Sequence, residues 1–443
     1  MLNRLLRLED FILREIGNFD KYFYYIMSGK GSTGEIRMIL KFKVAVNYKA
    51  LLSAANEALN LFPEFAVRPV LKGNKLFYEE NHNPVALLPL GSYDFGTSDM
   101  NGYLFCIQAD RSKEREIQFS AYHGLSDFSG LYRFFKTIIC RYAIHAKGLP
   151  DDYFNSVIRS KAPDKSEWET EENLKPYEIF AKQYTVPPYR PEISGEVFHM
   201  EETLSLDFTA ARRIKITVSK SKFLSAAKKY NTNFVPYFLY IASNAVRDAF
   251  NTDKNILVVL PADMKSVFKI DCITNFTCSL LLPSTLAEHK APVEEQCRRF
   301  RKMIELQKQP ENCARLLYDK VQKQNDIFSS PESIISKSRE IISKIPETAK
   351  LLSMPVSYPG SIDMPEGADD LFEDIIVTSA TSLLIDGQSY RDKFSIISTQ
   401  CYNSDKIAKA ICNRLSSEGL ESTITDIGPI EHNIMNLEKL KRV

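Results

Sequence analysis

The sequence contains few cysteines, and none of them forms a pair that suggests a metal site. The eight cysteines are scattered, mostly within apolar runs, and no two are spaced as C-x-x-C. This distribution is typical of reduced thiols packed in the core of a cytosolic protein. We therefore expect no structural zinc. The cysteines are Cys106, Cys140, Cys272, Cys278, Cys297, Cys313, Cys401 and Cys412.

Neither sign of charge is in excess. Lysine and arginine total 57 against 56 aspartates and glutamates, which gives a formal net charge of +1 at pH 7. Proteins that bind nucleic acids or anionic membranes usually present a strongly basic face. The balance argues against nucleic acid or a membrane surface as the main partner.

No apolar run is long enough to span a bilayer. The longest stretches, such as Phe234–Val246, are interrupted by polar residues, whereas a transmembrane helix needs about 20 mostly apolar residues. The segment Met1–Ile16 alternates charged residues with leucine and has neither the apolar core nor the small-residue cleavage site of a secretory signal. We expect a cytoplasmic chain without a membrane span.

Common catalytic and cofactor motifs are also missing. No pair among the six histidines has the spacing of metal ligands, and the absence of G-x-S-x-G disfavours a common serine hydrolase. Residues 29–34 match G-x-G-x-x-G. A dinucleotide-binding loop must lead into a helix, but Ile36–Val46 has a strand pattern. We interpret these glycines as a hairpin turn and expect no bound metal or cofactor.

The composition is that of a globular protein with more than one domain. A chain of 443 residues is too long for one ordinary core, and 44% hydrophobic with 26% charged residues is typical of globular proteins. Residues 1–160 mix strand and helix patterns with hairpin-like spacing. The expected helices are Leu2–Ile16, Tyr48–Leu61 and Leu131–Ala146, and the expected strands are Tyr22–Met27, Ile36–Val46, Phe65–Leu71, Lys75–Tyr78, Leu104–Gln108 and Glu116–Ala121.

A charged and proline-rich segment, residues 161–202, separates this part from a second part with the same ingredients. We interpret it as a crossover linker and predict a second subdomain over residues 203–443, with 420–443 as a surface tail. The expected strands there are Ala211–Val218, Ile256–Leu260, Asn275–Leu282, Asp374–Ser379 and Phe394–Thr399, and the expected helices are Ser219–Tyr230, Phe234–Phe250, Val293–Gln324, Ser333–Leu352 and Ser404–Ser417.

A histidine at the end of a strand pattern is the best candidate for a catalytic group. His123 follows the run Glu116–Ala121, Asp127 comes four residues later, and a helix pattern begins at Leu131. A cleft can reach an imidazole at such a strand-to-helix turn, where it can act as a general base. A structural histidine beside an N-capping aspartate would show the same spacing. Asp127 is suited to holding the loop through backbone N–H groups or a cation.

The segment Tyr122–Phe128 resembles the HHxxxDG motif of the chloramphenicol-acetyltransferase-like, CoA-dependent acyltransferases. This superfamily includes the condensation domains of nonribosomal peptide synthesis and the alcohol acetyltransferases. His123 matches the second motif histidine, which is the general base of the family. Asp127 matches the motif aspartate, which stabilises the loop through a salt bridge. The sequence departs from the motif in having Tyr122 for the first histidine and Phe128 for the glycine.

Further segments are similar to this family in the same order along the chain, so that the resemblance covers about Asp20 to Leu420. Leu260–Lys265 resembles the strand-end "P-x-D-x-R" of bacterial members, with lysine in place of arginine, and Asn275-Phe276 resembles their "NF". The other similar segments are Leu59–Pro69, Val356–Pro365 and Phe394–Gly419. Only the histidine motif is chemically specific.

The resemblance implies an α/β fold of two acetyltransferase-like sandwich subdomains, which form a V-shaped body with a channel at their interface. It also implies an acyltransferase in which His123 deprotonates an alcohol or amine acceptor as this attacks the thioester of acyl-CoA or of an acyl-carrier protein. A hydroxyl or N–H group would hold the oxyanion, and no metal is required. Candidate substrate or oxyanion contacts are Ser357, Tyr122 and Asn275; hydroxyls at Thr378 and Ser379 are further candidates, which local backbone would equally satisfy.

Two alternatives stay open. One is a stand-alone condensation-type enzyme that makes an amide from a carrier-protein thioester, and the other is a non-catalytic docking module of the same fold. The basic run Arg298–Lys302 is either a solvated helix face or a surface that docks a phosphopantetheine carrier or the CoA phosphates. We expect a monomer, because two halves of one chain can complete the channel.

Overall fold

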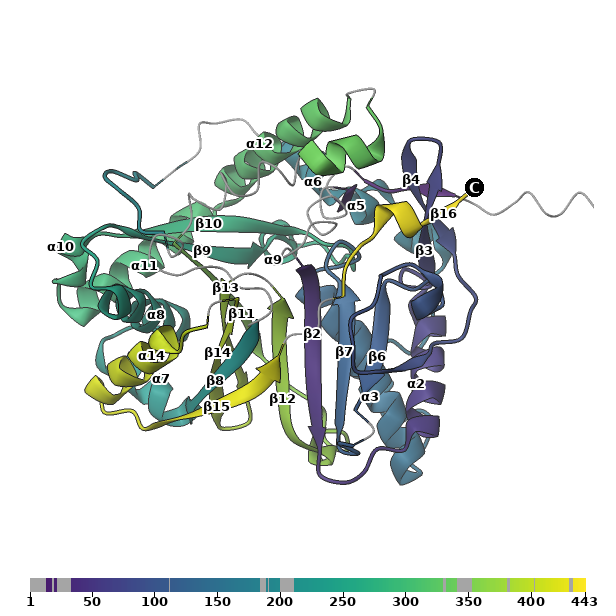
Figure 1. Ribbon diagram of the computed structural model, residues 1–443, viewed down its shortest axis with the longest axis horizontal. Coiled ribbons are helices and arrows are strands. Elements are labelled where there is room, and N and C mark those ends of the chain that lie inside the picture. Colours follow the sequence, from purple (N-terminus) through teal and green to yellow (C-terminus); the bar gives the residue numbers. More distant parts are fainter. Residues whose placement is uncertain are drawn as a thin grey trace, which may run out of the picture.

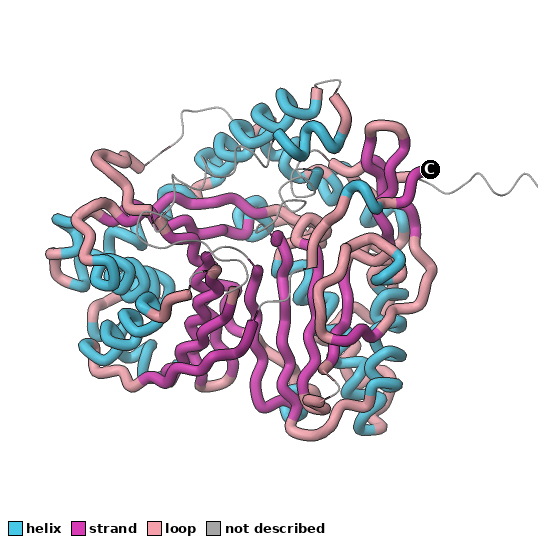
Figure 2. Tube along the Cα trace, in the orientation of Figure 1, coloured by secondary structure: helices cyan, strands magenta, loops and turns pink. Residues whose placement is uncertain are grey.

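The computed structural model describes residues 13–17, 20–21, 33–110, 112–183, 189, 191–199, 211–329, 332–340, 353–380, 383–401, 403–429 and 433–443. Three sheets and the helices that cover them make a mixed α/β molecule (Figure 1). The strands of the two larger sheets occupy the middle of the molecule, and helices lie on either side and above them (Figure 2). Among the described residues, no helix has the length and apolar character needed to cross a bilayer.

The first half is built on a five-stranded sheet of order β12-β2-β7-β6-β5, which is covered on one face by α2 and α3. Helix α2 has the bounds expected from its apolar spacing, and Asn47 caps it by accepting a hydrogen bond from the Ala50 N–H at 3.1 Å. The elements are β1 Arg14–Glu15, β2 Thr33–Phe42, α2 Tyr48–Leu61, β3 Val67–Lys72, β4 Lys75–Glu80, β5 Leu87–Pro89, a short 3₁₀ helix Ser98–Met100, β6 Phe105–Ala109, β7 Glu116–Tyr122 and α3 Phe128–Lys147.

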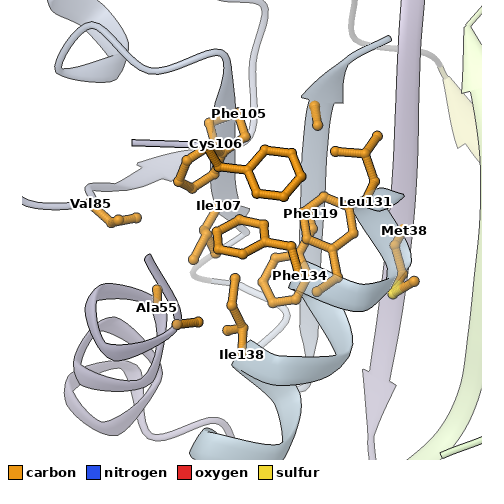
Figure 3. Close-up of a cluster of buried hydrophobic side chains, with 14 of the residues drawn as sticks. Met38, Ala55, Val85, Phe105, Cys106, Ile107, Phe119, Leu131, Phe134 and Ile138 are labelled. Atoms are coloured by element: carbon orange, nitrogen blue, oxygen red, sulfur yellow. The ribbon is translucent and has the colours of Figure 1, made fainter. Parts of the chain in front are cut away.

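The core of this half lies between the sheet and its two helices (Figure 3). Phe134 of α3 stacks on Phe65 with ring centroids 4.7 Å apart and meets Phe105 of β6 edge-on at 5.1 Å. Burying such aromatic side chains stabilises the fold by about 1.5–3 kcal/mol each. The core therefore fixes where β7 ends and α3 begins, which is where the histidine motif lies.

The second half is built on a seven-stranded sheet of order β10-β9-β11-β13-β14-β8-β15, with α7, α8 and α14 on its outer face. Ser219 caps α7 by accepting a hydrogen bond from the Lys222 N–H at 3.3 Å. The elements are α4 Lys165–Trp168, α5 Glu171–Leu174, α6 Pro176–Ala181, β8 Arg212–Ser219, α7 Lys220–Lys229, α8 Phe234–Phe250, β9 Ile256–Asp263, α9 Met264–Phe268, β10 Thr277–Ser284, α10 Leu286–His289, α11 Val293–Gln307, α12 Pro310–Phe328, β11 Met354–Ser361, a 3₁₀ helix Asp369–Leu371, β12 Phe372–Ala380, β13 Leu383–Tyr390, β14 Lys393–Gln400, α14 Lys406–Ser417, β15 Ser422–Pro429, a 3₁₀ helix Leu437–Lys439 and β16 Lys441–Arg442.

Strand β12 belongs to the second half of the sequence but pairs with β2 of the first half. The pairing is antiparallel, with Ile376 opposite Ile39. On the other side of β12, the Gln388 amide accepts from the Val377 N–H at 2.7 Å and donates to the Ile375 carbonyl at 3.1 Å. The two large sheets are thus joined by β12 of the five-stranded sheet and by the Gln388 side chain of β13 in the seven-stranded sheet. The division at residues 161–202 stays a prediction.

The prediction of a surface tail over residues 420–443 is wrong. Residues 422–429 form the edge strand β15, which pairs with β8. Residues 433–443 pack on the first half, where β16 pairs with β3 and completes a four-stranded sheet of order β1-β4-β3-β16. Met435, Leu437 and Leu440 are buried there. Asn433 donates to Glu35 Oε1 at 3.0 Å.

Two expected helices also need correction. The region Val293–Gln324 is two helices, because the chain turns at residues 308–309 and Pro310 starts α12 at a position where proline is favoured. Arg14–Glu15 is a strand rather than the end of a helix. Four predicted features lie wholly or partly outside the described residues. They are the first part of the Leu2–Ile16 helix (residues 1–12), the Tyr22–Met27 strand (22–27), the glycine-rich turn (29–32) and the end of the Ser333–Leu352 helix (341–352).

Candidate active site

The loop from His123 to Asp127 connects the end of β7 to the start of α3. The His123 N–H donates to the Gly34 carbonyl of β2 at 2.6 Å, which fixes the loop to the neighbouring strand. A side chain at Gly124 would meet the ring of Tyr122 at 2.3 Å, so that only glycine fits there. Tyr122 is fully buried, and its hydroxyl lies 3.5 Å from the backbone oxygen of Asp20. This tyrosine therefore packs beneath the loop.

Asp127 is the buried anchor of the loop. Its Oδ1 accepts hydrogen bonds from the Gly130 N–H at 3.1 Å, as the N-cap of α3, and from the Ser129 hydroxyl at 2.8 Å. Its Oδ2 accepts from the Phe276 N–H at 2.9 Å. The carboxylate is only 3% exposed. With so many donors, the group is suited to holding structure rather than to moving a proton.

The ionic partner of Asp127 is Lys265. The lysine Nζ lies 2.6 Å from Oδ1 and 3.1 Å from the Ser129 hydroxyl, and the lysine is 8% exposed. Lys265 lies at the start of α9, directly after β9. It is the lysine that stands in place of the arginine of the "P-x-D-x-R" pattern that Leu260–Lys265 resembles. The pair connects the first half to the β9–β10 region of the second half. The salt bridge expected for Asp127 is therefore present, with a lysine as its cation.

His123 and Asn275 meet across the two halves. The Asn275 amide donates to the His123 carbonyl at 3.0 Å and its nitrogen lies 3.2 Å from Nδ1 of the ring. Asn275 is 1% exposed, whereas His123 is partly exposed. Asn275 was expected to contact substrate or oxyanion; the structure places it beside the imidazole, where its amide holds the His123 carbonyl.

The surroundings of His123 favour a neutral imidazole. Burial lowers the pKa of His123 below its usual value, and the nearby Lys265 ammonium acts in the same direction. Hydrogen bonds of the ring with its own backbone and the charge of Asp127 oppose this effect without cancelling it. A neutral imidazole at neutral pH can accept a proton.

The three hydroxyl candidates of the second half surround a buried carboxyl that sequence reasoning missed. Asp386 of β13 is 3% exposed and accepts hydrogen bonds from Ser357, from Thr378 and from the backbone of Ser379. Thr378 also bonds to Thr399 at 2.7 Å. The Ser357 hydroxyl is thus directed to Asp386. An acidic residue inside the apolar run Leu383–Gly387 was the available signal, since buried polar groups are the informative exception in strands.

Asp386 makes the stability of the fold fall as the pH rises from about 4 to 7. Burial raises its pKa to about 7, against about 3.9 in an unfolded chain. Between these values the folded state binds more protons than the unfolded state, so that the free energy of unfolding decreases by up to about 1.4 kcal/mol per pH unit. Asp386→Asn removes this contribution.

We expect urea denaturation to show the Asp386→Asn variant gaining stability relative to the native protein between pH 5 and about 8. The comparison of the two proteins at each pH cancels the contributions of the other titrating groups. A stability difference that does not change with pH would contradict the raised pKa of Asp386.

The basic run Arg298–Lys302 lies on α11 and is largely paired with neighbours. Arg298 lies 3.8 Å from Glu295, Arg299 pairs with Glu288, and Arg301 donates to the Asn231 carbonyl at 3.1 Å. These contacts favour a solvated helix face. Within the described ranges no group of three potential metal ligands is found, and seven of the eight cysteines are buried, which confirms the prediction of core-packed thiols.

Comparisons with known proteins reveal a shared fold and no sequence match. No family model and no curated protein matches the chain. The structure of F. sporotrichioides TRI101 in complex with coenzyme A and T-2 is similar with a TM-score of 0.57 at 11% identity, over 94% of this chain and 100% of that chain. Polyketide synthase associated protein 5 from Mycobacterium tuberculosis gives 0.55 at 12% identity, over 90% and 96%.

A variant of the starter condensation domain of rhizomide synthetase RzmA, in complex with C8-CoA and Leu-SNAC, is also similar. Its TM-score is 0.56 at 9% identity, over 92% of this chain and 93% of that chain. Likeness over nearly the whole length of each chain establishes the architecture. The chain has the mixed α/β fold of TRI101 and of this condensation domain.

Proposed function

We propose that this protein is an acyltransferase that moves an acyl group from a thioester to an alcohol or amine, with His123 as general base. The observation that carries the proposal is the position of the imidazole at the end of β7, beside Asn275 and on a loop that Asp127 and Lys265 anchor. The lowered pKa of His123 is consistent with a base at this position. A base whose position and protonation are both fixed is what such a reaction needs.

The proposed reaction is a direct transfer. His123 accepts the proton of the acceptor hydroxyl or amine as the acceptor oxygen or nitrogen attacks the thioester carbonyl. The tetrahedral intermediate collapses, the carbon–sulfur bond breaks, and the thiolate recovers the proton from the imidazolium. We assign proton transfer to Nε2, in the tautomer whose Nδ1–H donates to the His123 carbonyl. In this tautomer the Asn275 amide donates to the same carbonyl and not to the ring.

The donor is proposed to be acyl-CoA or a phosphopantetheinyl thioester on a carrier protein. Solved structures of the same fold contain coenzyme A or C8-CoA. We further propose that donor and acceptor reach His123 from opposite mouths of a channel between the two sheets. Such a channel would shield the thioester from water, which competes for the acyl group.

The test measures release of free thiol and formation of acylated product. Purified protein is given acetyl-CoA or octanoyl-CoA, and in a second arm the same acyl groups on a carrier protein, each with a panel of alcohols and amines. We expect acceptor-dependent thiol release with a matching product mass. Transfer only from the carrier-protein thioester to an amine would identify a condensation-type enzyme. Neither binding nor turnover of any thioester would contradict the proposal and support a docking module.

A further inference from the structure

A cavity of about 360 Å³ lies against the candidate active-site loop. Its inner wall includes Leu125 of the loop and Thr274, the neighbour of Asn275. Leu125 is two residues after His123, so that their Cα atoms are at most about 7 Å apart. The outer wall comes from β1 and from α4 and α5 of the crossover segment. Volumes of this order suit a small organic ligand.

Arg14 lines this cavity with a guanidinium that hydrogen-bonds to none of the described residues. Its Cζ atom lies 5.0 Å from the ring centroid of Tyr78 and 5.0 Å from that of Trp168. Its Nη1 is shielded from solvent without a hydrogen-bond partner. Two aromatic rings thus hold a planar group of five donors in place. An unmet donor shielded from water costs free energy that a ligand can recover.

Most other charged groups of the cavity wall already have partners. Both carboxylate oxygens of Glu64 accept from Nη1 of Arg159 at 2.9 Å. Glu15 pairs with Lys21 at 3.1 Å, and Asp271 pairs with Arg133. For Asp20, burial and the nearby Glu178 raise the pKa well above its usual value although the charge of Arg14 opposes this shift. Arg14 is attracted by Glu169, Asp20 and Glu64, but its Nη1 hydrogen-bonds to none of the described residues.

The wall as a whole contains more acids than bases. Five carboxyl side chains and three cationic ones face the cavity; they are Glu15, Asp20, Glu64, Glu167 and Asp271 against Arg14, Arg159 and Lys175. This balance disfavours a ligand with several negative charges, such as the phosphates of coenzyme A. A single planar carboxylate matches the guanidinium fork and adds only one charge.

We propose that this cavity binds the acyl acceptor and that Arg14 pairs with a carboxylate of that acceptor. The inference rests on the proposed acyl transfer, since it names the class of its acceptor: a hydroxy or amino compound that also has a carboxylate. Arg14 recognises the carboxylate while the hydroxyl or amine reaches past Leu125 toward His123. The rings of Tyr78 and Trp168 hold the Arg14 guanidinium in the orientation that a planar pair with the carboxylate needs.

The experiment compares acids with their uncharged amides. Lactate, mandelate and salicylate are offered with acetyl-CoA beside lactamide, mandelamide and salicylamide, to the native protein and to Arg14→Gln. We expect kcat/KM for the best acid to exceed that for its amide at least about tenfold, in line with a charge-assisted pair. Arg14→Gln abolishes this preference, because KM increases far more for the acid than for the amide. Arg14→Lys keeps part of the preference.

Controls separate this inference from the proposed function. Arg133→Gln removes one positive charge near the cavity without lining it and keeps the preference; thermal unfolding checks that Arg14→Gln and Arg14→Lys are folded. Saturation-transfer NMR with each acid and amide, without donor, reports binding alone. Acid binding that disappears in Arg14→Gln supports the cavity assignment even if no transfer occurs, in which case the acyl-transfer proposal fails. Equal binding of acid and amide, or CoA affinity lost in Arg14→Gln, overturns the assignment.

Discussion

Replacement of His123 by alanine should leave a folded protein whose acyl transfer is slower by about 10²–10⁴-fold, the contribution typical of a general base. The described side-chain contact of His123 is with Asn275, while Asp127 and the Gly34 carbonyl hold the backbone of the loop. Loss of the ring therefore removes the proton acceptor without unfolding the loop. Single-turnover thiol release and thermal unfolding measure the two effects separately.

A second histidine provides the control. His145 lies near the end of α3, where it contacts Glu57 at 2.7 Å, and His145→Ala should keep the native rate. The pH profile supplies a further check. Because burial lowers the pKa of His123, kcat/KM of the native protein should decrease only below about pH 6.5, as the imidazole becomes protonated. Native turnover by His123→Ala would end the assignment of the base.

Replacement of Asp127 by asparagine should destabilise the fold and slow the reaction together. The variant leaves the Lys265 ammonium, 8% exposed, without its carboxylate, and breaking a buried pair in this way costs about 3–5 kcal/mol. The loop then loses its connection to Phe276 and with it the position of His123. Urea denaturation and thiol release measure both losses. A large loss of rate at unchanged stability would contradict the anchoring role.

A substitution of Lys265 distinguishes the two possible causes of the destabilisation in Asp127→Asn, namely the lost ion pair and the lost cap of α3. Adding Lys265→Met to Asp127→Asn removes the unpaired ammonium, so that the double variant should be more stable than Asp127→Asn alone. Asp370→Asn is the matched control, because Asp370 pairs with Lys147 on the surface and exposed pairs contribute about 0–1 kcal/mol. A double variant as unstable as the sum of the single variants would indicate that the two side chains act independently.

The helices were the most predictable part of the fold. The expected bounds of Tyr48–Leu61 and Phe234–Phe250 match α2 and α8, since their apolar periodicity and flanking residues lie within the segment itself. Strands β11 and β13 were not predicted. Met354–Ser361 contains proline and glycine, and it forms a strand because β9 and β13 lie on either side of it. Such pairing depends on residues far away in sequence.

The residues of the candidate site also differ in how far the sequence alone could predict them. The spacing of His123 and Asp127 is visible in seven residues, and Lys265 could be proposed from its resemblance to an arginine segment. Asp386 has only the weaker signal of an acid within an apolar run, and Arg14 has none. Their properties come from burial by distant strands and from rings at Tyr78 and Trp168. Chemistry that depends on such long-range contacts requires the structure.

The pairing of β12 with β2 has a consequence for how the protein folds during synthesis. During synthesis the edge of β2 that pairs with β12 stays open until residue 380 has left the ribosome, and the surface that receives residues 433–443 stays open until those residues emerge. An open strand edge is a template for unwanted pairing with other chains. A chaperone is therefore needed most while the first half has emerged without β12, because the edge of β2 is then exposed. A fragment that ends between the two halves should aggregate and not fold as an independent unit.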